Sequence, residues 1–94
     1  MIAYLSGKVA AIHEKALVLD VQGVGYLVHV PRELLEKAVE SQDLQLFVHT
    51  NVREDDISLY GFQTKEQWRF FRLLLTVSGI GPKYALEIMN APLN

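Results

Sequence analysis

The sequence predicts a small β-barrel followed by an α-helical segment, and three observations lead to this fold class. Short runs of strand-forming residues, separated by turn signals, occupy residues 1–62. From residue 63 onward the apolar residues follow a helical period instead. The chain has 94 residues, of which 50% are hydrophobic. This size allows one small domain and part of another, and the composition excludes a disordered tail.

The first three predicted strands lie close together along the chain. Residues 2–12 are mostly apolar but are interrupted at Ser6-Gly7-Lys8. Residues 16–21 are rich in strand formers, and residues 26–30 follow the turn signal Gly23-Val24-Gly25. Short strands at this spacing are typical of a small barrel or sandwich.

A short helix and a hairpin complete the predicted barrel. Pro31 suits a helix start, where its missing N–H is not needed, so we expect a helix at 32–39. Alternation resumes at 44–52, residues 53–56 form a turn, and residues 57–62 form the return strand. Five strands and one helix predict an OB-fold-like Greek-key barrel, whose closure removes exposed sheet edges.

Residues 63–94 are predicted to form two helices joined by a tight turn. Thr64 is expected to cap the first helix, and Gln67, three residues later, completes a capping box. Two apolar rows follow, the first formed by Trp68, Phe71 and Leu75 and the second by Phe70, Leu74 and Val77. We therefore expect this helix to pack on the barrel and also on the next helix or another subunit. Pro82 begins the second helix. The predicted domains are a barrel domain at 1–62 and the first part of a helix-hairpin-helix domain at 63–94.

Formal charge is distributed unevenly between these two parts. The chain carries −2 at pH 7. Residues 1–62 hold five basic and nine acidic side chains, which gives −4, and residues 63–94 hold four basic and two acidic ones, which gives +2. Such asymmetry indicates two parts with different roles.

No pattern typical of an enzyme occurs in the sequence. The absence of cysteine excludes a disulfide scaffold, thiolate catalysis and cysteine-based zinc sites. The chain has no P-loop, dinucleotide fingerprint or nucleophile elbow. His29 and His49 lie in different predicted strands and could face each other, but with His13 they lack the pattern of a metal or catalytic site. We therefore expect no catalytic residue, no cofactor and no metal. Without a signal peptide or a long apolar run, a cytoplasmic protein with no membrane segment is expected.

The strongest functional signal lies in residues 74–89, which resemble a helix-hairpin-helix. Gly79 and Gly81 allow a tight turn and a close backbone approach, and the amides that follow lie at a helix N-terminus, which favours an anion. Lys83 can add a charge on the same phosphate, and Ile80 is expected to point inward. These four residues are the candidate DNA phosphate-binding site, which would contact the backbone without reading bases. The alternative is a plain connection between helices with glycine as a C-cap.

Two charged features allow more than one interpretation. Lys65, Arg69 and Arg72 share one helix face, as a second phosphate-facing stripe or, more commonly, as a solvated face. Glu54, Asp55 and Asp56 follow Arg53 in the predicted hairpin. These acids form an ordinary solvated turn, a partial cation site that lacks further ligands, or a local element that repels DNA phosphates.

The whole chain resembles the N-terminal part of the RuvA family, the junction-recognition subunits of bacterial Holliday junction branch-migration complexes. The matching stretches occur in the same order and spacing, at the Met-Ile start with Leu5-Ser6-Gly7, at 21–31, at 52–62 and at 78–86. The resemblance implies an OB-fold barrel, a domain with two helix-hairpin-helix motifs, and a mobile C-terminal domain. It also implies tetramers or pairs of tetramers on an open four-way junction in homologous recombination and DNA repair.

The resemblance further implies site residues and partners. Glu54 and Asp55 match the family's acidic pin, which keeps the arms of the junction apart, and Asp56 is an additional acid. The full-length protein would engage the RuvB motor, which supplies the catalytic activity, and the RuvC nuclease. Because the chain ends before the second helix-hairpin-helix, we expect a fragment with weaker junction binding and no stimulation of the motor.

Three functional hypotheses follow from these observations. The first is a non-catalytic module that binds four-way junction DNA without sequence specificity. The second is an oligomerisation module with little DNA binding, suggested by the broad apolar surface of the helix at 68–75. The third, an OB-fold single-strand binder, needs aromatic stacking platforms on a basic groove, and the charge of −4 on the barrel argues against it.

Overall fold

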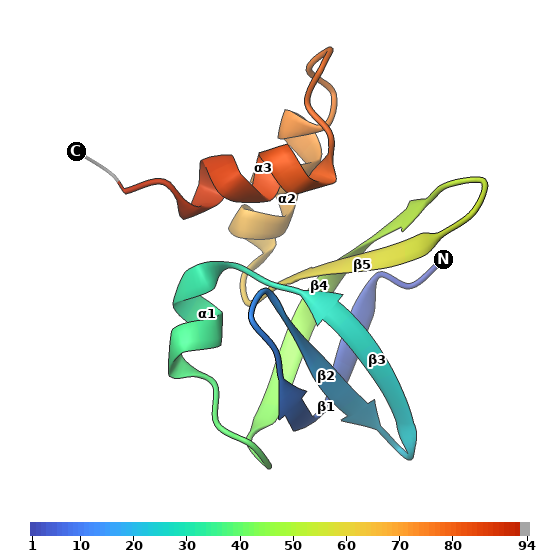
Figure 1. Cartoon of the computed structure of the whole chain (residues 1–94), viewed down its shortest axis with the longest axis vertical. Coiled ribbons are helices and arrows are strands. Elements are labelled where there is room, and N and C mark those ends of the chain that lie inside the picture. The colour runs from blue at the N-terminus through green and yellow to red at the C-terminus, as the bar shows by residue number, and fades with distance from the viewer. Residues whose placement is uncertain (93–94) are drawn as a thin grey trace.

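The computed structural model describes residues 1–92, which form a closed five-stranded barrel and three helices (Figure 1). Positions 93 and 94 of the predicted second domain lie outside the described residues. The elements in chain order are β1 (Tyr4–Ile12), β2 (Ala16–Val21), β3 (Val24–His29), α1 (Arg32–Lys37), β4 (Asp43–Val52), β5 (Ile57–Phe62), α2 (Lys65–Leu74) and α3 (Pro82–Asn90).

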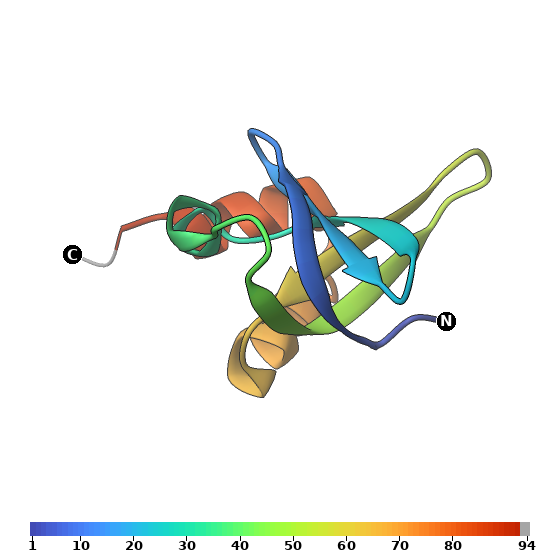
Figure 2. The ribbon, with the colours of Figure 1, turned by 90° about the horizontal axis from the view of Figure 1, so that it is seen from below.

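The barrel has the strand order β1-β2-β3-β5-β4, with β4 pairing back to β1. All neighbours are antiparallel except β3 and β5, which run parallel where Val28 meets Leu59 and His29 meets Tyr60. The helix α1 connects β3 to β4, and Figures 1 and 2 place it on the opposite side of the barrel from the β4–β5 hairpin. The predicted OB-fold-like barrel is therefore confirmed.

The break in the apolar run at Ser6-Gly7-Lys8 does not end the first strand, because β1 continues through these residues. Gly7 is needed for close packing of strands and not for a turn, since a Cβ atom there would overlap the backbone oxygen of Asp20 on β2. The strand bends further along instead, where its register with β2 shifts between Val9 and Ala11.

Two predicted boundaries also move. β3 begins at Val24 and not at Tyr26, because the turn consists of Gln22 and Gly23, which both have positive φ (52° and 91°). This is the geometry of a two-residue hairpin turn, and the Asp20 carboxylate supports it by accepting a 2.8 Å hydrogen bond from the Gly23 N–H. The helix α1 ends at Lys37, two residues earlier than predicted.

Two hydrophobic clusters stabilise the molecule. The first fills the barrel with side chains such as Leu17, Leu46 and Val28, none of which is exposed to solvent. The second lies outside the barrel and consists of Tyr60, Phe62, Phe71, Ala85 and Leu86. Because these residues come from β5, α2 and α3, the second cluster joins the helices to the barrel wall.

The helix α2 packs on both the barrel and α3, as expected. Thr64 Oγ1 accepts a 3.1 Å hydrogen bond from the Gln67 N–H, which confirms the predicted N-cap. Trp68 Nε1 donates a 3.0 Å hydrogen bond to the Val48 carbonyl on β4, and the Phe71 ring is fully buried against Tyr60 and Phe62. None of the helices formed by residues 1–92 combines the length and apolar character that a membrane span requires.

Candidate nucleic-acid interface

The α2–α3 hairpin presents an open backbone surface at its two glycines. Gly79 has φ of 87°, which favours glycine, whereas Gly81 is the extended N-cap of α3 with φ of −93°. A Cβ atom at either position would meet no other atom within 4 Å. Another molecule can therefore approach the backbone closely at both glycines.

The amides at the start of α3 are available as hydrogen-bond donors. Among residues 1–92, the N–H groups of Gly81, Lys83 and Tyr84 have no hydrogen-bond partner, as expected for the first turn of a helix. Ile80 differs, because its N–H donates a 3.1 Å hydrogen bond to the Val77 carbonyl and its side chain packs against the second hydrophobic cluster. Ile80 thus points inward as predicted, and its role in the loop is structural.

The exposed Lys83 lies near a row of rings on the barrel wall. In this row His29, Tyr60 and His49 are neighbours across β3, β5 and β4. The two histidines therefore do not face each other, because Tyr60 lies between them. The His29 ring stacks on Tyr60 at 5.1 Å, and the His49 ring contacts Phe71 edge-on at 5.6 Å.

Both histidines favour the neutral form in this row. Burial lowers the pKa of His29, and the positive charge of Lys83 lowers it further, while Asp56 opposes the shift. Burial also lowers the pKa of His49, and Arg72 adds to that effect. The pKa of His29 is therefore affected both by Lys83 of the α2–α3 hairpin and by Asp56 of the acidic turn.

The acidic turn forms the tip of a hairpin that projects from the barrel. The β4–β5 ladder runs to the pair Val52–Ile57, and the Arg53 N–H donates a 2.7 Å hydrogen bond to the Asp56 carbonyl to close the turn. Residues 53–56 are all exposed. Within the described part of the chain, none of the three acids of this turn forms an ion pair.

Sequence reasoning did not single out two apolar residues that flank this turn. Val52 and Ile57 are each 66% exposed and lie directly opposite each other. These two side chains add a small apolar surface next to the three acids. The signal was visible in the sequence as two β-branched residues adjoining four charged ones.

Two of the three basic residues on one face of α2, Lys65, Arg69 and Arg72, contact aromatic rings of the same chain. The Lys65 ammonium lies 5.8 Å from the centre of the Phe47 ring, and the Arg72 guanidinium lies 4.6 Å from that of Trp68. Two of the three cations therefore cover aromatic rings, which favours a solvated, structural face over a stripe of free cations. Arg69 is exposed.

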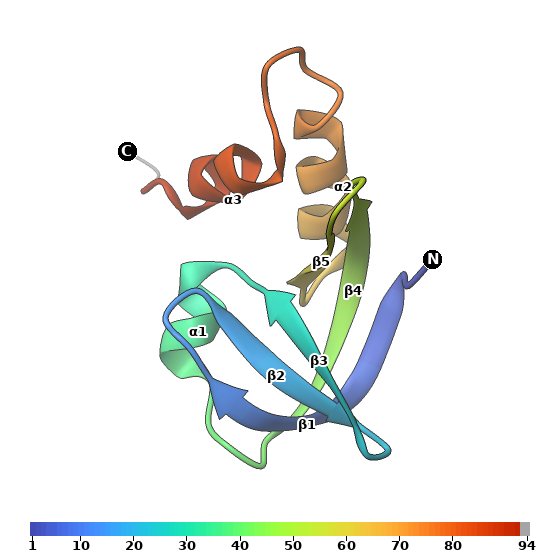
Figure 3. The same cartoon turned by 45° about the vertical axis from the view of Figure 1, so that its right-hand side comes forward.

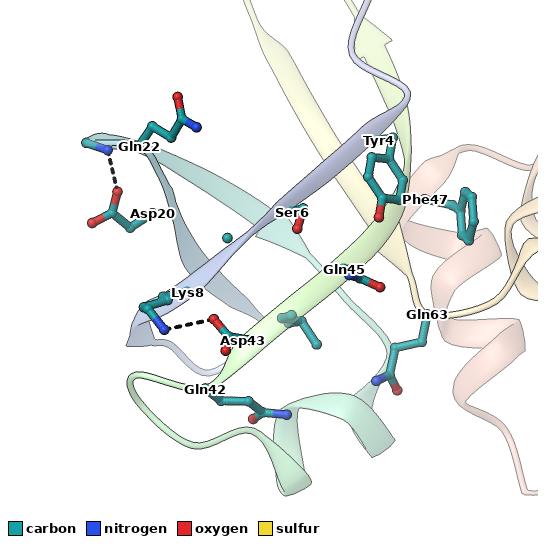
Figure 4. A pocket seen from close by; sticks show the side chains of 13 residues that line it. Tyr4, Ser6, Lys8, Asp20, Gln22, Gln42, Asp43, Gln45, Phe47 and Gln63 are labelled. Carbon is teal, nitrogen blue, oxygen red and sulfur yellow. Dashed lines mark hydrogen bonds and ion pairs between the residues drawn. The ribbon is translucent and has the colours of Figure 1, made fainter.

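A groove on the surface of the barrel lies away from both features. It has a volume of about 920 Å³ and runs between β1 and β4, with Tyr4 and Phe47 near one end and the ion pair of Lys8 and Asp43 (2.8 Å) at the other (Figure 4). Since its lysine is paired with a carboxylate, the groove is not basic. Among residues 1–92, no three histidine or acidic side chains come together in a possible metal site.

The hairpin loop and the acidic turn point toward the same end of the molecule. In Figures 1 and 3, the α2–α3 loop and the tip of the β4–β5 hairpin both extend upward, whereas α1 and the β2–β3 turn lie at the lower end. The structure therefore brings the predicted phosphate-binding loop and the predicted pin to one side, with the row of His29, Tyr60 and His49 on the barrel wall that supports them.

Comparison with known proteins identifies the family. Residues 1–61 match the family model described as RuvA N terminal domain. The chain is 46% identical over 91 residues to the Holliday junction branch migration complex subunit RuvA of Geobacter sulfurreducens, covering 96% of this chain and 46% of that protein. It is 48% identical over 90 residues to the subunit of the same name from Rickettsia typhi, covering 96% of this chain and 45% of that protein. The chain thus spans just under half the length of these relatives, and, on the match over residues 1–61, it belongs to the RuvA N-terminal domain family.

Proposed function

We propose that this chain binds four-way junction DNA through its sugar–phosphate backbone, as part of the recognition subunit of a branch-migration complex. Residues 1–62 would serve as the barrel domain, and residues 63–94 as the first part of a helix-hairpin-helix domain. The names of the relatives as subunits of a Holliday junction branch migration complex support this proposal. In the complete protein, partners would include further copies of the chain in a tetramer or octamer, the RuvB motor and the RuvC nuclease.

The observation that carries the proposal is that a surface that attracts phosphates and a turn that repels them lie at one end of the molecule. The start of α3 offers amides that have no partner among residues 1–92, an exposed lysine and open space at two glycines, which is the chemistry that binds a phosphate. The hairpin tip offers three acids that form no ion pair with any other described residue, and these repel phosphates. A ligand that satisfies both has phosphates near α3 and a gap near the pin, as an open junction has between its arms.

Substitution of Lys83 by Glu tests the attractive half of this proposal. The variant K83E should weaken binding to junctions of every sequence alike, and the slope of log affinity against log salt should become shallower by about one. Gel-shift titration at several salt concentrations measures both quantities, with K15E as the matched control because Lys15 is an exposed lysine on the β1–β2 loop. Equal junction affinity for K83E and K15E would contradict the assignment of the hairpin.

A second candidate function is assembly, favoured by the exposed apolar surface of α2 and its loop. Phe70, Leu73 and Val77 are 46%, 63% and 51% exposed, and the sequence predicted that this helix packs on the barrel and also on the next helix or another subunit. Under this proposal another copy of the chain covers these side chains, and DNA binding is negligible. Light scattering with and without junction DNA separates the two functions, because a stable oligomer that ignores DNA would favour assembly.

A further inference from the structure

Asn90, the last residue of α3, connects the helical segment to the far side of the barrel. Its side-chain oxygen Oδ1 accepts a 3.0 Å hydrogen bond from the backbone N–H of Arg32, which precedes it by 58 residues. Arg32 is the first residue of α1, and the N-cap of that helix is Pro31, which provides no side-chain cap. One of the N–H groups in the first turn of α1, which have no partner within that helix, thus obtains its acceptor from α3.

The hydrogen bond between Asn90 and Arg32 restrains a motion of α3 relative to the barrel that the other contacts of the helices restrain less. Only Gln63 and Thr64 connect β5 to α2. The helix α2 is fixed directly, by the Trp68 hydrogen bond to Val48 and by the stacking of Phe71 on Tyr60 at 5.3 Å. The helix α3 lies further along the chain, and its apolar contacts are formed by Ala85 and Leu86 in the shared cluster and by Met89, which packs against it. Those apolar contacts have no preferred direction, whereas the Asn90 hydrogen bond fixes the C-terminal end of α3 against α1.

We infer that Asn90 is a positioning residue that fixes the α2–α3 loop at a set distance and angle from the acidic turn on the barrel. This inference rests on the proposed function. A duplex arm binds at the α2–α3 loop alone, whereas a junction bound at the loop also places the gap between its arms at the repelling pin. When α3 is free to move, the bound phosphates no longer keep a set distance from the pin, so junction affinity decreases more than duplex affinity.

The geometric part of the inference is measured without DNA. Because the chain has no cysteine, spin labels attach only where cysteine is introduced. Glu14→Cys on the β1–β2 loop and Ser78→Cys on the α2–α3 loop are both exposed positions. In this labelled background N90A should broaden the distance distribution between the labels measured by pulsed electron paramagnetic resonance. N90D keeps a carboxylate oxygen as acceptor for the Arg32 N–H and should restore the narrow distribution.

The functional part compares junction and duplex affinities of the same variants without labels. N90A should lower the ratio of junction affinity to duplex affinity by about threefold to tenfold, which is the factor that one ordinary hydrogen bond corresponds to. N90D should restore the ratio. K37A is the matched control, because it removes the 3.0 Å bond from Lys37 to Glu33 within α1 without affecting a contact between barrel and α3.

Two outcomes would separate the inference from the proposed function. An unchanged distance distribution in N90A, or equal broadening in K37A, would overturn the role of Asn90. A broadened distribution in N90A together with no junction preference in the unsubstituted chain would support the mechanical role of Asn90 and contradict the proposed function instead.

Discussion

The two glycines of the α2–α3 loop differ in what they contribute. Gly79 has a positive φ that other residues adopt only with strain, whereas Gly81 has an ordinary extended conformation. Both positions have open space around the missing side chain. Gly79 is therefore required by the backbone itself, and Gly81 is required only if another molecule occupies that space.

This difference predicts opposite results for two alanine variants. G79A should lower stability by about 1–2 kcal/mol because of its φ. G81A should change stability by less than about 0.5 kcal/mol, since it is a surface substitution without strain, yet it should weaken junction binding because its Cβ atom lies where a phosphate would approach. Thermal unfolding and gel-shift titration measure the two effects. Full junction affinity in G81A would indicate that DNA does not approach the loop at this glycine.

At the scale of single residues, the sequence predicted the roles of side chains in local motifs better than it predicted hydrogen bonds between distant residues. Thr64 and Ile80 could be placed because capping boxes and hairpin loops are local patterns. The bond between Asn90 and Arg32 joins residues 58 positions apart, and no local pattern indicates it. Gly7 stands in a break of the apolar run, and the sequence could not show that its lack of a side chain allows two strands to approach closely.

Among the elements, the β4–β5 hairpin has a charge pattern that predicts a specific defect. Neutralising Glu54 and Asp55 in the double variant E54Q/D55N removes two of the acids at the tip, and those acids form no ion pair within residues 1–92 whose loss would destabilise the fold. Plain duplex should then bind nearly as well as a junction, because repulsion no longer selects the open arrangement. Competition between labelled junction and unlabelled duplex measures the preference.

The double variant E36Q/E40Q provides the control for net charge. It changes the formal charge by the same amount at exposed positions on and after α1, which lies on the opposite side of the barrel. If both double variants reduce the junction preference equally, then overall charge and not the pin is responsible.

The helices show how far periodicity alone determines an element. The helical period predicted that α2 would bury more than one face, and the row of Trp68 and Phe71 does contact the barrel. Periodicity places Arg72 one turn after Trp68 on the same helix, which is the spacing of a contact. It could not show that Lys65 would cover the Phe47 ring, because Phe47 is 18 residues earlier and belongs to the barrel. The contact between Lys65 and Phe47 depends on the angle between two packed elements.

For the whole molecule, the row formed by His29, Tyr60 and His49 links stability to pH. The folded state lowers the pKa of both histidines below the ordinary value of 6.5, so below that pH the unfolded chain binds more protons than the folded chain. The stability that the neutral rings provide is therefore complete above pH 6.5 and is lost as the pH falls toward the lowered values. Since this row lies under α2 and α3, the contacts between helices and barrel are the ones weakened.

The measurement is the melting temperature of the chain between about pH 7 and pH 5.5, above the range in which ordinary carboxylates titrate. The unsubstituted chain should lose stability on acidification across this window. The double variant H29Q/H49Q should be less stable at pH 7 but should change much less with pH. Parallel pH profiles for the two proteins would show that neither histidine is responsible.

The overall architecture could be predicted because its determinants are distributed along the whole chain. Strand lengths, turn residues and the change of period near residue 63 all favour a barrel followed by helices, and the parallel pairing of β3 with β5 then closes it. The direction in which the hairpin loop and the acidic turn project could not be predicted. That direction depends on the second hydrophobic cluster, which is formed by residues from both parts of the chain.

The strand β4 extends beyond the end of its pairing with β1, and this affects how quickly its backbone amides exchange with solvent. The pairing of β1 with β4 ends at Phe47, and the last bonds from β4 to the N-terminal segment join Thr50 to Ile2. Among residues 1–92, Asn51 and Val52 then have only β5 beside them. A two-stranded ribbon is marginally stable by itself, and this one is stabilised because it continues two strands of the closed barrel. Deuterium uptake should rise along β4 from Leu46 to Val52 and should be highest beside the acidic turn.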